Sequence, residues 1–130
     1  MPLLLMQKGD PEMVSVELCT RDGGDQVVVA LRGELDVTDA AEVAASLAAV
    51  AAGKRDIIVD LAGLEYIDSS GLAALVRARQ RALHAGSDLL LAAPQQQVLR
   101  MLALTRLIDF FPVRACTGEA AGPGAVESGQ

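Results

Sequence analysis

The segment that most restricts the fold of this chain is an apolar run, Ile57-Ile58-Val59-Asp60-Leu61, between two segments with helical periodicity. A run that is nearly all apolar is typical of a β-strand covered on both faces. Before it, Val43, Leu47 and Val50 recur at helical spacing, and Gly53 ends that pattern. A helix, a buried strand and another helix in this order predict a sheet with parallel crossovers.

The N-terminal part of the chain has the pattern of a β-hairpin. Residues 13–18 alternate between apolar and polar side chains, which predicts a strand with one solvated face. Residues 27–31 form a second apolar run that leads into Gly33. The segment 21–25 between them contains two glycines and favours a turn, because glycine permits the positive φ that hairpin turns need.

Three helices are expected in the rest of the chain. The first begins with Thr38 as its N-cap. The second covers residues 70–85 and stops at Gly86, and the third starts at Pro94. The side chains expected to face the core from the second and third helices are Leu72, Leu75, Val76, Leu83, Val98, Leu99 and Leu102. Those expected to face water from the second helix are Arg77, Gln80, Arg81 and His84.

Short strands at residues 88–92 and 110–113 complete the pattern, and a proline in the last of them favours an edge position. The order is therefore β-β-α-β-α-β-α-β, an α/β fold with one mixed sheet and too few strands for a barrel. A chain of 130 residues suits a single core. We expect one domain over residues 13–114, an N-terminal tail over 1–12 and a flexible C-terminal tail over 115–130.

Composition and charge argue against several classes of function. The formal net charge is −6, so direct binding to nucleic acid or to an anionic membrane would gain nothing from electrostatics. One tyrosine, two phenylalanines and no tryptophan leave little for base stacking. The apolar start lacks the basic region and cleavage site of a signal peptide, and no run approaches the ~18 apolar residues of a membrane span. The sequence predicts a cytoplasmic protein, in which Cys19 and Cys116 are expected to be thiols.

No enzymatic site is predicted. The one histidine, His84, lies about fifteen residues beyond Ser69 on the same expected helix, roughly 20 Å away at 1.5 Å per residue. That separation excludes a Ser-His relay, and no nucleophile-elbow or phosphate-cradling glycine motif is present. Four aspartates, at positions 36, 39, 60 and 68, could suggest a divalent metal, but solvated or capping carboxylates explain them better. We expect no catalytic residue, no metal and no cofactor.

Two adjacent serines, Ser69 and Ser70, stand where the central strand gives way to the second helix. A helix N-terminus has unpaired backbone N–H groups and a partial positive charge, so it favours an anion. A serine hydroxyl there is either a cap or a place where a phosphoryl group arrives and leaves. The position after a strand end, where open α/β sheets present their sites, and the uncovered backbone at Gly71 favour the second alternative.

The segment Asp68-Ser69-Ser70-Gly71-Leu72, preceded by Leu64-Glu65-Tyr66-Ile67, resembles the signature of STAS domains. A second anchor is Arg32-Gly33-Glu34-Leu35-Asp36, which matches the family's Gly-Glu-Leu-Asp loop before the first helix. A third is Leu104-Thr105-Arg106-Leu107, which is followed by Phe111-Pro112-Val113. These segments stand in the family's order over the expected domain. Within the family, the chain is most similar to the bacterial anti-sigma factor antagonists.

The resemblance implies an adaptor that is controlled by phosphorylation. Such a protein, when unphosphorylated, binds an anti-sigma factor that is also a serine kinase, and so releases a sigma factor for transcription. The resemblance implies that this kinase phosphorylates Ser69, the serine directly after the aspartate, and that a serine phosphatase reverses the step. The docking residues that it implies are Gly33, Glu34, Leu35, Asp36, Thr38, Asp68, Ser70 and Gly71.

The sequence departs from the family in one place and leaves one alternative open. Arg106 stands where many relatives carry glycine, which is expected to alter the turn after the third helix and to leave the switch intact. The alternative is a STAS module that serves as a constitutive subunit of a lipid-transport or signalling complex, with Ser69 only a cap. Fold alone does not separate the two functions. The Asp-Ser-Ser-Gly sequence and the free-standing length favour the phosphorylation switch.

Overall fold

The computed structural model describes residues 16–115 of the chain. An N-terminal hairpin is followed by three helix–strand units, in the order predicted from the sequence. The elements are β1 (Val16–Asp22), β2 (Gln26–Leu35), α1 (Val37–Ala51), β3 (Asp56–Ile67), α2 (Ser69–His84), β4 (Leu89–Ala92), α3 (Gln96–Leu104) and β5 (Val113–Arg114). Residues 13–15 of the expected first strand and the expected tail segments 1–12 and 116–130 lie outside the described residues.

The five strands form one mixed sheet in the order β1-β2-β3-β4-β5. The hairpin strands are antiparallel, and every later neighbour is parallel, as the crossover pattern predicts. The hairpin turn contains Gly24 at φ 82°. Asp22 accepts the Gly24 N–H and pairs with Arg55 at 2.8 Å, and these two contacts hold the pKa of the Asp22 carboxyl below its usual value. β5 has two residues and lies at the edge of the sheet as expected, but it begins at Val113, where the strand predicted over residues 110–113 was to end.

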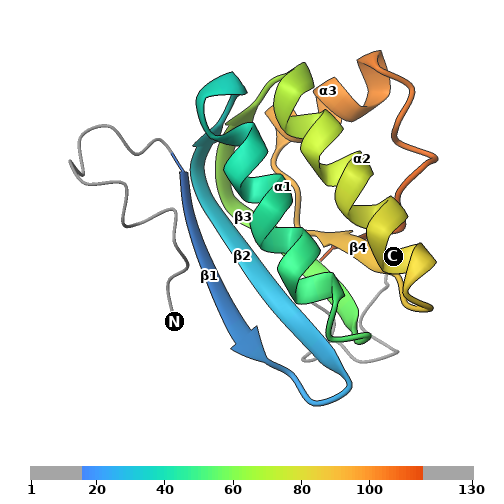
Figure 1. The fold of residues 1–130 in the computed structure, drawn as a ribbon. Helices are drawn as coiled ribbons and strands as arrows, with labels where there is room; N and C mark the ends of the chain where they lie inside the picture. Colours follow the sequence, from blue (N-terminus) through green and yellow to red (C-terminus); the bar gives the residue numbers. More distant parts are fainter. Residues whose placement is uncertain (1–15, 116–130) are drawn as a thin grey trace.

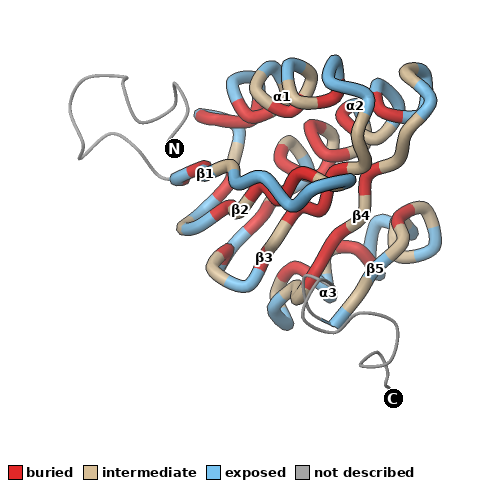
Figure 2. Tube along the Cα trace, turned by 90° about the horizontal axis from the view of Figure 1, so that it is seen from below, coloured by how far each residue is buried: buried red, intermediate tan, exposed pale blue. Residues whose placement is uncertain are grey.

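Helices α1 and α2 lie side by side across one face of the sheet (Figure 1). One core cluster joins side chains of all three helices to that face. In Figure 2 the buried segments, drawn in red, lie mainly on the strands and on the parts of α1 and α2 that face them. Representative members are Val29, Val59 and Leu91 from the strands and Val43, Leu75 and Leu102 from the helices.

The predicted core residues are wrong at two positions. Leu83 is 47% exposed and Leu99 is 37% exposed. On α2 the buried line continues from Leu75 through Ala78 and Ala82, at helical spacing, so the residue after Ala82 is rotated away from the core. Leu83, which was expected to face the core, therefore faces water.

Strand β3 is longer than predicted, because it continues to Ile67 where a loop was expected. Its parallel pairing with β2 extends to the register pair Leu35–Ile67. The pairing passes two register shifts, one between Ala30 and Arg32 and one between Gly33 and Glu34, and Gly33 has φ 98° at the second. These irregularities hid the strand in the hydrophobic pattern, since each one breaks the alternation of faces.

Helices α2 and α3 end in the same hydrogen-bonded motif but with different residues at its left-handed position. In α2 that residue is Gly86, at φ 90°, and the Ser87 N–H donates to Ala82 O at 2.9 Å. In α3 it is Arg106, at φ 64°, and the Leu107 N–H donates to Leu102 O at 2.8 Å. This is the Schellman arrangement, in which glycine is the usual residue at the left-handed position.

We therefore expect Arg106→Gly to stabilise the protein by about 0.5–1 kcal/mol, because it relieves a side chain held in a left-handed conformation. The measurement is a chemical denaturation midpoint at unchanged slope. Gly86→Ala, in the same motif of α2, is the matched control and should lose about 1 kcal/mol. A lower midpoint for Arg106→Gly would contradict this expectation, because it would show that contacts of the arginine side chain stabilise the protein by more than the backbone strain destabilises it.

Candidate functional site

The candidate site lies at the edge of the sheet where β2 and β3 end together. Leu35 and Ile67 are register partners, and the Asp68 N–H donates to Leu35 O at 3.2 Å. Helix α1 begins at Val37 and helix α2 at Ser69, directly after these strand ends. The two helix N-termini therefore open at the same edge of the sheet, where both contribute partial positive charge.

Each of these helices is capped by an aspartate. Asp36 Oδ1 accepts the Thr38 N–H at 3.0 Å, and Asp68 Oδ1 accepts the Gly71 N–H at 3.0 Å. The prediction that Thr38 caps the first helix is wrong, and so is the interpretation of Ser69 as only a cap. In both cases the cap is an aspartate that precedes the predicted residue, and its charge also favours the helix dipole.

Ser69 is the first residue of α2 and is exposed, whereas Ser70 is half-buried. Because Asp68 supplies the cap, the Ser69 hydroxyl has no part in starting the helix. The hydroxyl therefore stands at a helix N-terminus, accessible to another protein and beside a carboxylate. Such a position accommodates an added anion without unfolding the helix.

The other predicted docking residues divide into exposed and buried ones. Glu34 and Thr38 are exposed. Leu35 is fully buried, and Gly71 is buried against the strand ends. A Cβ added at Gly71 would lie 2.7 Å from Ile67 Cγ1 and 2.9 Å from Leu35 O, so only glycine lets α2 start this close to the sheet. Gly33 is half-buried and takes part in the register shift of β2.

Two exposed apolar residues near this edge were missed by the sequence analysis. Val37, the first residue of α1, is 72% exposed, and Tyr66, the register partner of Glu34, is 42% exposed. The available signal for Val37 was its position, since it precedes the apolar stripe of α1. Exposed apolar side chains beside polar ones are the usual composition of a protein-binding surface.

Gln97 was also missed, and it holds the end of β3. Strand β4 pairs with β3 only from Ile57 to Asp60, and within residues 16–115 no other strand pairs with the second half of β3 on that side. The Gln97 side chain takes the place of a strand: its Oε1 accepts the Ile67 N–H at 2.9 Å, and its Nε2 donates to Ile67 O at 3.0 Å. Gln95 Nε2 donates in the same way to Ala62 O at 2.6 Å. Helix α3 therefore fixes the backbone immediately before Asp68 and Ser69.

We expect Gln97→Ala to destabilise the protein by about 1–3 kcal/mol, because it removes the hydrogen-bond partners of a buried backbone N–H and carbonyl. Hydrogen exchange should also accelerate at the Ile67 amide. Gln96→Ala is the matched control, since that neighbouring side chain is exposed, and it should stay within about 0.5 kcal/mol of wild type. Equal effects of the two substitutions would contradict the role given to Gln97.

The arrangement matches neither the hydrolytic nor the metal alternative. Ser69 and His84 are the first and last residues of α2, so they lie at opposite ends of one helix. Asp36 and Asp68 serve as caps, and Asp60 accepts the Ala62 N–H at 3.0 Å. Between residues 16 and 115, no group of three or more His, Cys, Asp or Glu side chains could hold a metal ion.

No helix within the described part of the chain is long and apolar enough to span a membrane. Of the two cysteines, Cys19 is exposed on β1, and Cys116 lies outside the described residues.

The fold and the site define an α/β domain that presents an exposed serine at a helix N-terminus. Residues 16–120 match the sequence model of the STAS domain, and the chain belongs to the STAS domain family. It is 27% identical over 113 residues to the anti-sigma-B factor antagonist of Listeria monocytogenes, which covers 86% of this chain and 98% of that relative. It is 31% identical over 104 residues to BtrV of Bordetella bronchiseptica, a protein named for an expected role as an anti-sigma factor antagonist, covering 78% of this chain and 89% of the relative.

A solved structure agrees with this assignment. An anti-sigma factor antagonist from Mycobacterium paratuberculosis matches the fold with a TM-score of 0.69 at 25% identity, over 76% of this chain and 85% of that one. The resemblance to STAS domains and to anti-sigma factor antagonists is thus confirmed, as are the α/β class and the element order. These relatives are named as regulators, in agreement with the prediction that the chain is not an enzyme.

Proposed function

We propose that this protein is an anti-sigma factor antagonist controlled by phosphorylation of Ser69. In the unphosphorylated form it binds an anti-sigma factor that is also a serine kinase, and a sigma factor is released for transcription. The kinase transfers the γ-phosphoryl group of ATP to Ser69 Oγ, and a serine phosphatase removes it again. The protein acts in the cytoplasm, where its transcriptional partners work.

The observation that supports this proposal most directly is the separation of roles between Asp68 and Ser69. Asp68 caps α2 through the Gly71 N–H, so the helix keeps its cap when Ser69 is modified. Ser69 is exposed and Ser70 is half-buried, so a kinase reaches Ser69 without unwinding the helix. This favours Ser69 over Ser70 as the phosphoacceptor.

Electrostatics explains how a phosphate would release the partner without unfolding the protein. Phosphorylation adds about −1.5 to −2 charges and three acceptor oxygens. The N-terminus of α2 tolerates this charge, because its dipole and free N–H groups favour an anion. The same edge already carries Asp36 and Asp68, with Glu34 exposed on the adjoining strand end. A partner fitted to that acidic surface would meet added charge on docking, and the complex would be weakened.

The proposed docking surface consists of exposed residues on a rigid base. Its exposed members are Glu34, Val37, Thr38 and Ser69, with Ser70 half-buried beside them. Its base contains Gly33, Leu35, Asp36, Asp68 and Gly71, which set the strand ends and the helix starts. Val37 adds an exposed apolar side chain to this polar surface, and burial of apolar area is the main source of affinity in such contacts.

The proposal is tested by mapping the phosphorylated residue. The protein is incubated with ATP and each serine-kinase anti-sigma factor of its own host, and phosphopeptides are sequenced by mass spectrometry. Phosphate is expected on Ser69 in the wild type and in Ser70→Ala, and none is expected in Ser69→Ala. A wild-type protein that binds a host partner and never carries phosphate at residue 69 would favour the constitutive STAS adaptor. Phosphate on Ser70 alone would overturn the residue assignment.

A further inference from the structure

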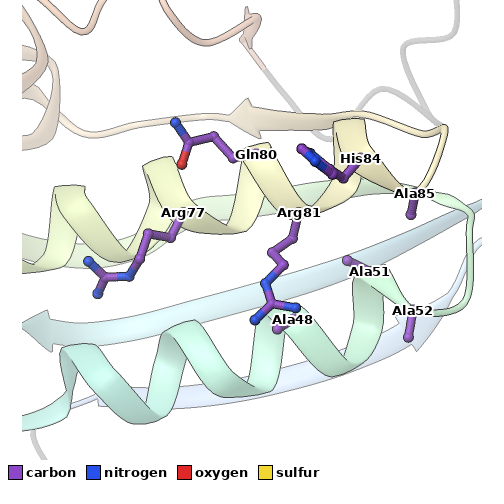
Figure 3. A pocket seen from close by; sticks show the side chains of 8 residues that line it. All are labelled: Ala48, Ala51, Ala52, Arg77, Gln80, Arg81, His84 and Ala85. Carbon is purple, nitrogen blue, oxygen red and sulfur yellow. The ribbon is translucent and has the colours of Figure 1, made fainter.

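The C-terminal halves of α1 and α2 enclose a groove at some distance from Ser69 (Figure 3). Its volume is about 640 Å³. Ala48, Ala51 and Ala52 line it from α1, and Arg77, Arg81 and His84 are among the residues that line it from α2. At 1.5 Å per residue, these α2 positions lie roughly 12–22 Å along the helix from Ser69, so the groove is separate from the phosphorylation site.

The α1 side of the groove is apolar and is formed by small side chains. Residues 43–52, which form the second part of α1 and its C-cap, contain no charged side chain, and six of these ten are alanine. Alanine side chains add little height to a helix surface, which lets another helix approach closely. Two packed helices with a row of small residues between them leave a trough along their length, and a third helix fits a trough of that shape.

The α2 side of the groove is basic, and two of its arginines have no counter-ion among the described residues. Helix α2 contains no acidic residue, although the chain as a whole has a net charge of −6. Arg79 on this helix is paired with Asp88 at 2.8 Å, but Arg77 and Arg81 are exposed and form no ion pair or side-chain hydrogen bond within residues 16–115. In Figure 3 both arginines extend from α2 towards the α1 side. Two arginines without a counter-ion in the described part of the chain therefore border the alanines of α1.

We propose that this groove binds an acidic helical segment of a partner protein. Arg77 and Arg81 are four residues apart and so stand one turn apart, about 6 Å along the axis. Carboxylates at positions i and i+4 of a bound helix have the same spacing, so each can pair with one arginine. The alanines of α1 receive the small apolar side chains of that helix. The rest of the molecule has a negative net charge, so it would repel the carboxylates of a helix bound in another orientation. This inference goes beyond the phosphorylation switch and does not depend on it.

The test uses a capped peptide of Glu-Ala-Ala-Ala repeats, about 20 residues long so that it forms a helix. The peptide is titrated into the isotope-labelled full chain and followed by NMR. Amide shifts are expected at Ala48, Ala52, Arg77 and Arg81, and affinity should fall as salt is raised. A Lys-Ala-Ala-Ala peptide is the control probe and should produce no shift there.

Charge-reversal variants test whether Arg77 and Arg81 bind the acidic peptide. The double variant Arg77→Glu with Arg81→Glu should bind the acidic peptide roughly tenfold more weakly and gain affinity for the lysine peptide, because two ion pairs are reversed in sign. Arg100→Glu, which reverses an exposed arginine on α3, should bind as wild type does. If the double variant fails to fold, Arg77→Gln with Arg81→Gln should still weaken binding.

Three outcomes would overturn the proposal. The first is that the acidic peptide shifts no groove amide at millimolar concentration. The second is that the double variant and wild type bind it equally. The third is that the groove amides shift with protein concentration in the absence of peptide, which would identify a second copy of this chain as the occupant. Loss of phosphorylation in Ser69→Ala would change none of these results, so the groove and the switch are tested separately.

Discussion

Ser69→Asp is expected to weaken binding to the proposed anti-sigma kinase on the order of 100-fold, since a like charge placed in an interface costs several kcal/mol. The substitution puts a fixed negative charge beside Asp68 at the proposed docking surface. It should not destabilise the fold, because an acidic residue in the first turn of α2 favours the helix dipole. The measurements are partner affinity by calorimetry and the denaturation midpoint of each purified variant.

Ser69→Ala is the matched control for this result. It should bind as the unphosphorylated wild type does and remain bound in the presence of ATP. Its unfolding free energy should change by less than about 0.5 kcal/mol, because the helix is capped by Asp68 and the Ser69 side chain is exposed. Asp68→Ala should instead cost about 0.5–2 kcal/mol. An aspartate variant that binds as tightly as wild type would argue for the constitutive adaptor.

Gly71→Ala should destabilise the protein by about 1–3 kcal/mol, although alanine is a better helix former than glycine. The added methyl group would approach Ile67 Cγ1 at 2.7 Å and both Leu35 Cγ and Leu35 O at 2.9 Å. A backbone oxygen is one of these contacts, so a rotamer change alone does not relieve the crowding. The measurement is the denaturation midpoint, with partner affinity as a second readout, because α2 must shift away from the two strand ends.

Gly53→Ala, at the end of α1, separates this crowding from the general effect of adding a methyl group. Its added Cβ would meet only Val50 O, at 3.3 Å, and the change in stability should stay within about 0.5 kcal/mol. Similar midpoints for both glycine variants would contradict the packing role of Gly71. In that case the glycine of the Asp-Ser-Ser-Gly segment would need another explanation, such as direct contact with the partner.

The order of elements could be predicted from the sequence because each has a strong local signal. Apolar runs mark β2, β3 and β4, and an apolar stripe marks the buried face of α1. Gly24 marks the hairpin turn, and Gly86 marks the end of α2. The position of Ser69 at a strand-to-helix junction was also readable, since it needs only the neighbouring segments. These features depend on residues close together in the chain.

The remaining features depend on residues far apart in the chain. The extent of β3 is set by its pairing with β2 across two register shifts, which no single-strand pattern shows. Gln97 reaches Ile67 from 30 positions away, and its sequence context is simply a run of glutamines. Thr38 was predicted as the cap of α1 and Ser69 was considered as a cap of α2, but in each helix a preceding aspartate is the cap. The exposure of Leu83 likewise depends on which side of α2 faces the core, where Ala78 and Ala82 are buried.

The two glutamine contacts on β3 also bear on self-association. A strand that runs past its neighbour presents unpaired amides and carbonyls, onto which a strand from another molecule can add. Gln95 and Gln97 hydrogen-bond the backbone of β3 at Ala62 and Ile67, beyond the last residue paired with β4. The regulator thereby closes part of a potential aggregation edge with its own side chains. Solubility at high concentration should accordingly depend on α3 staying docked, even when no partner is bound.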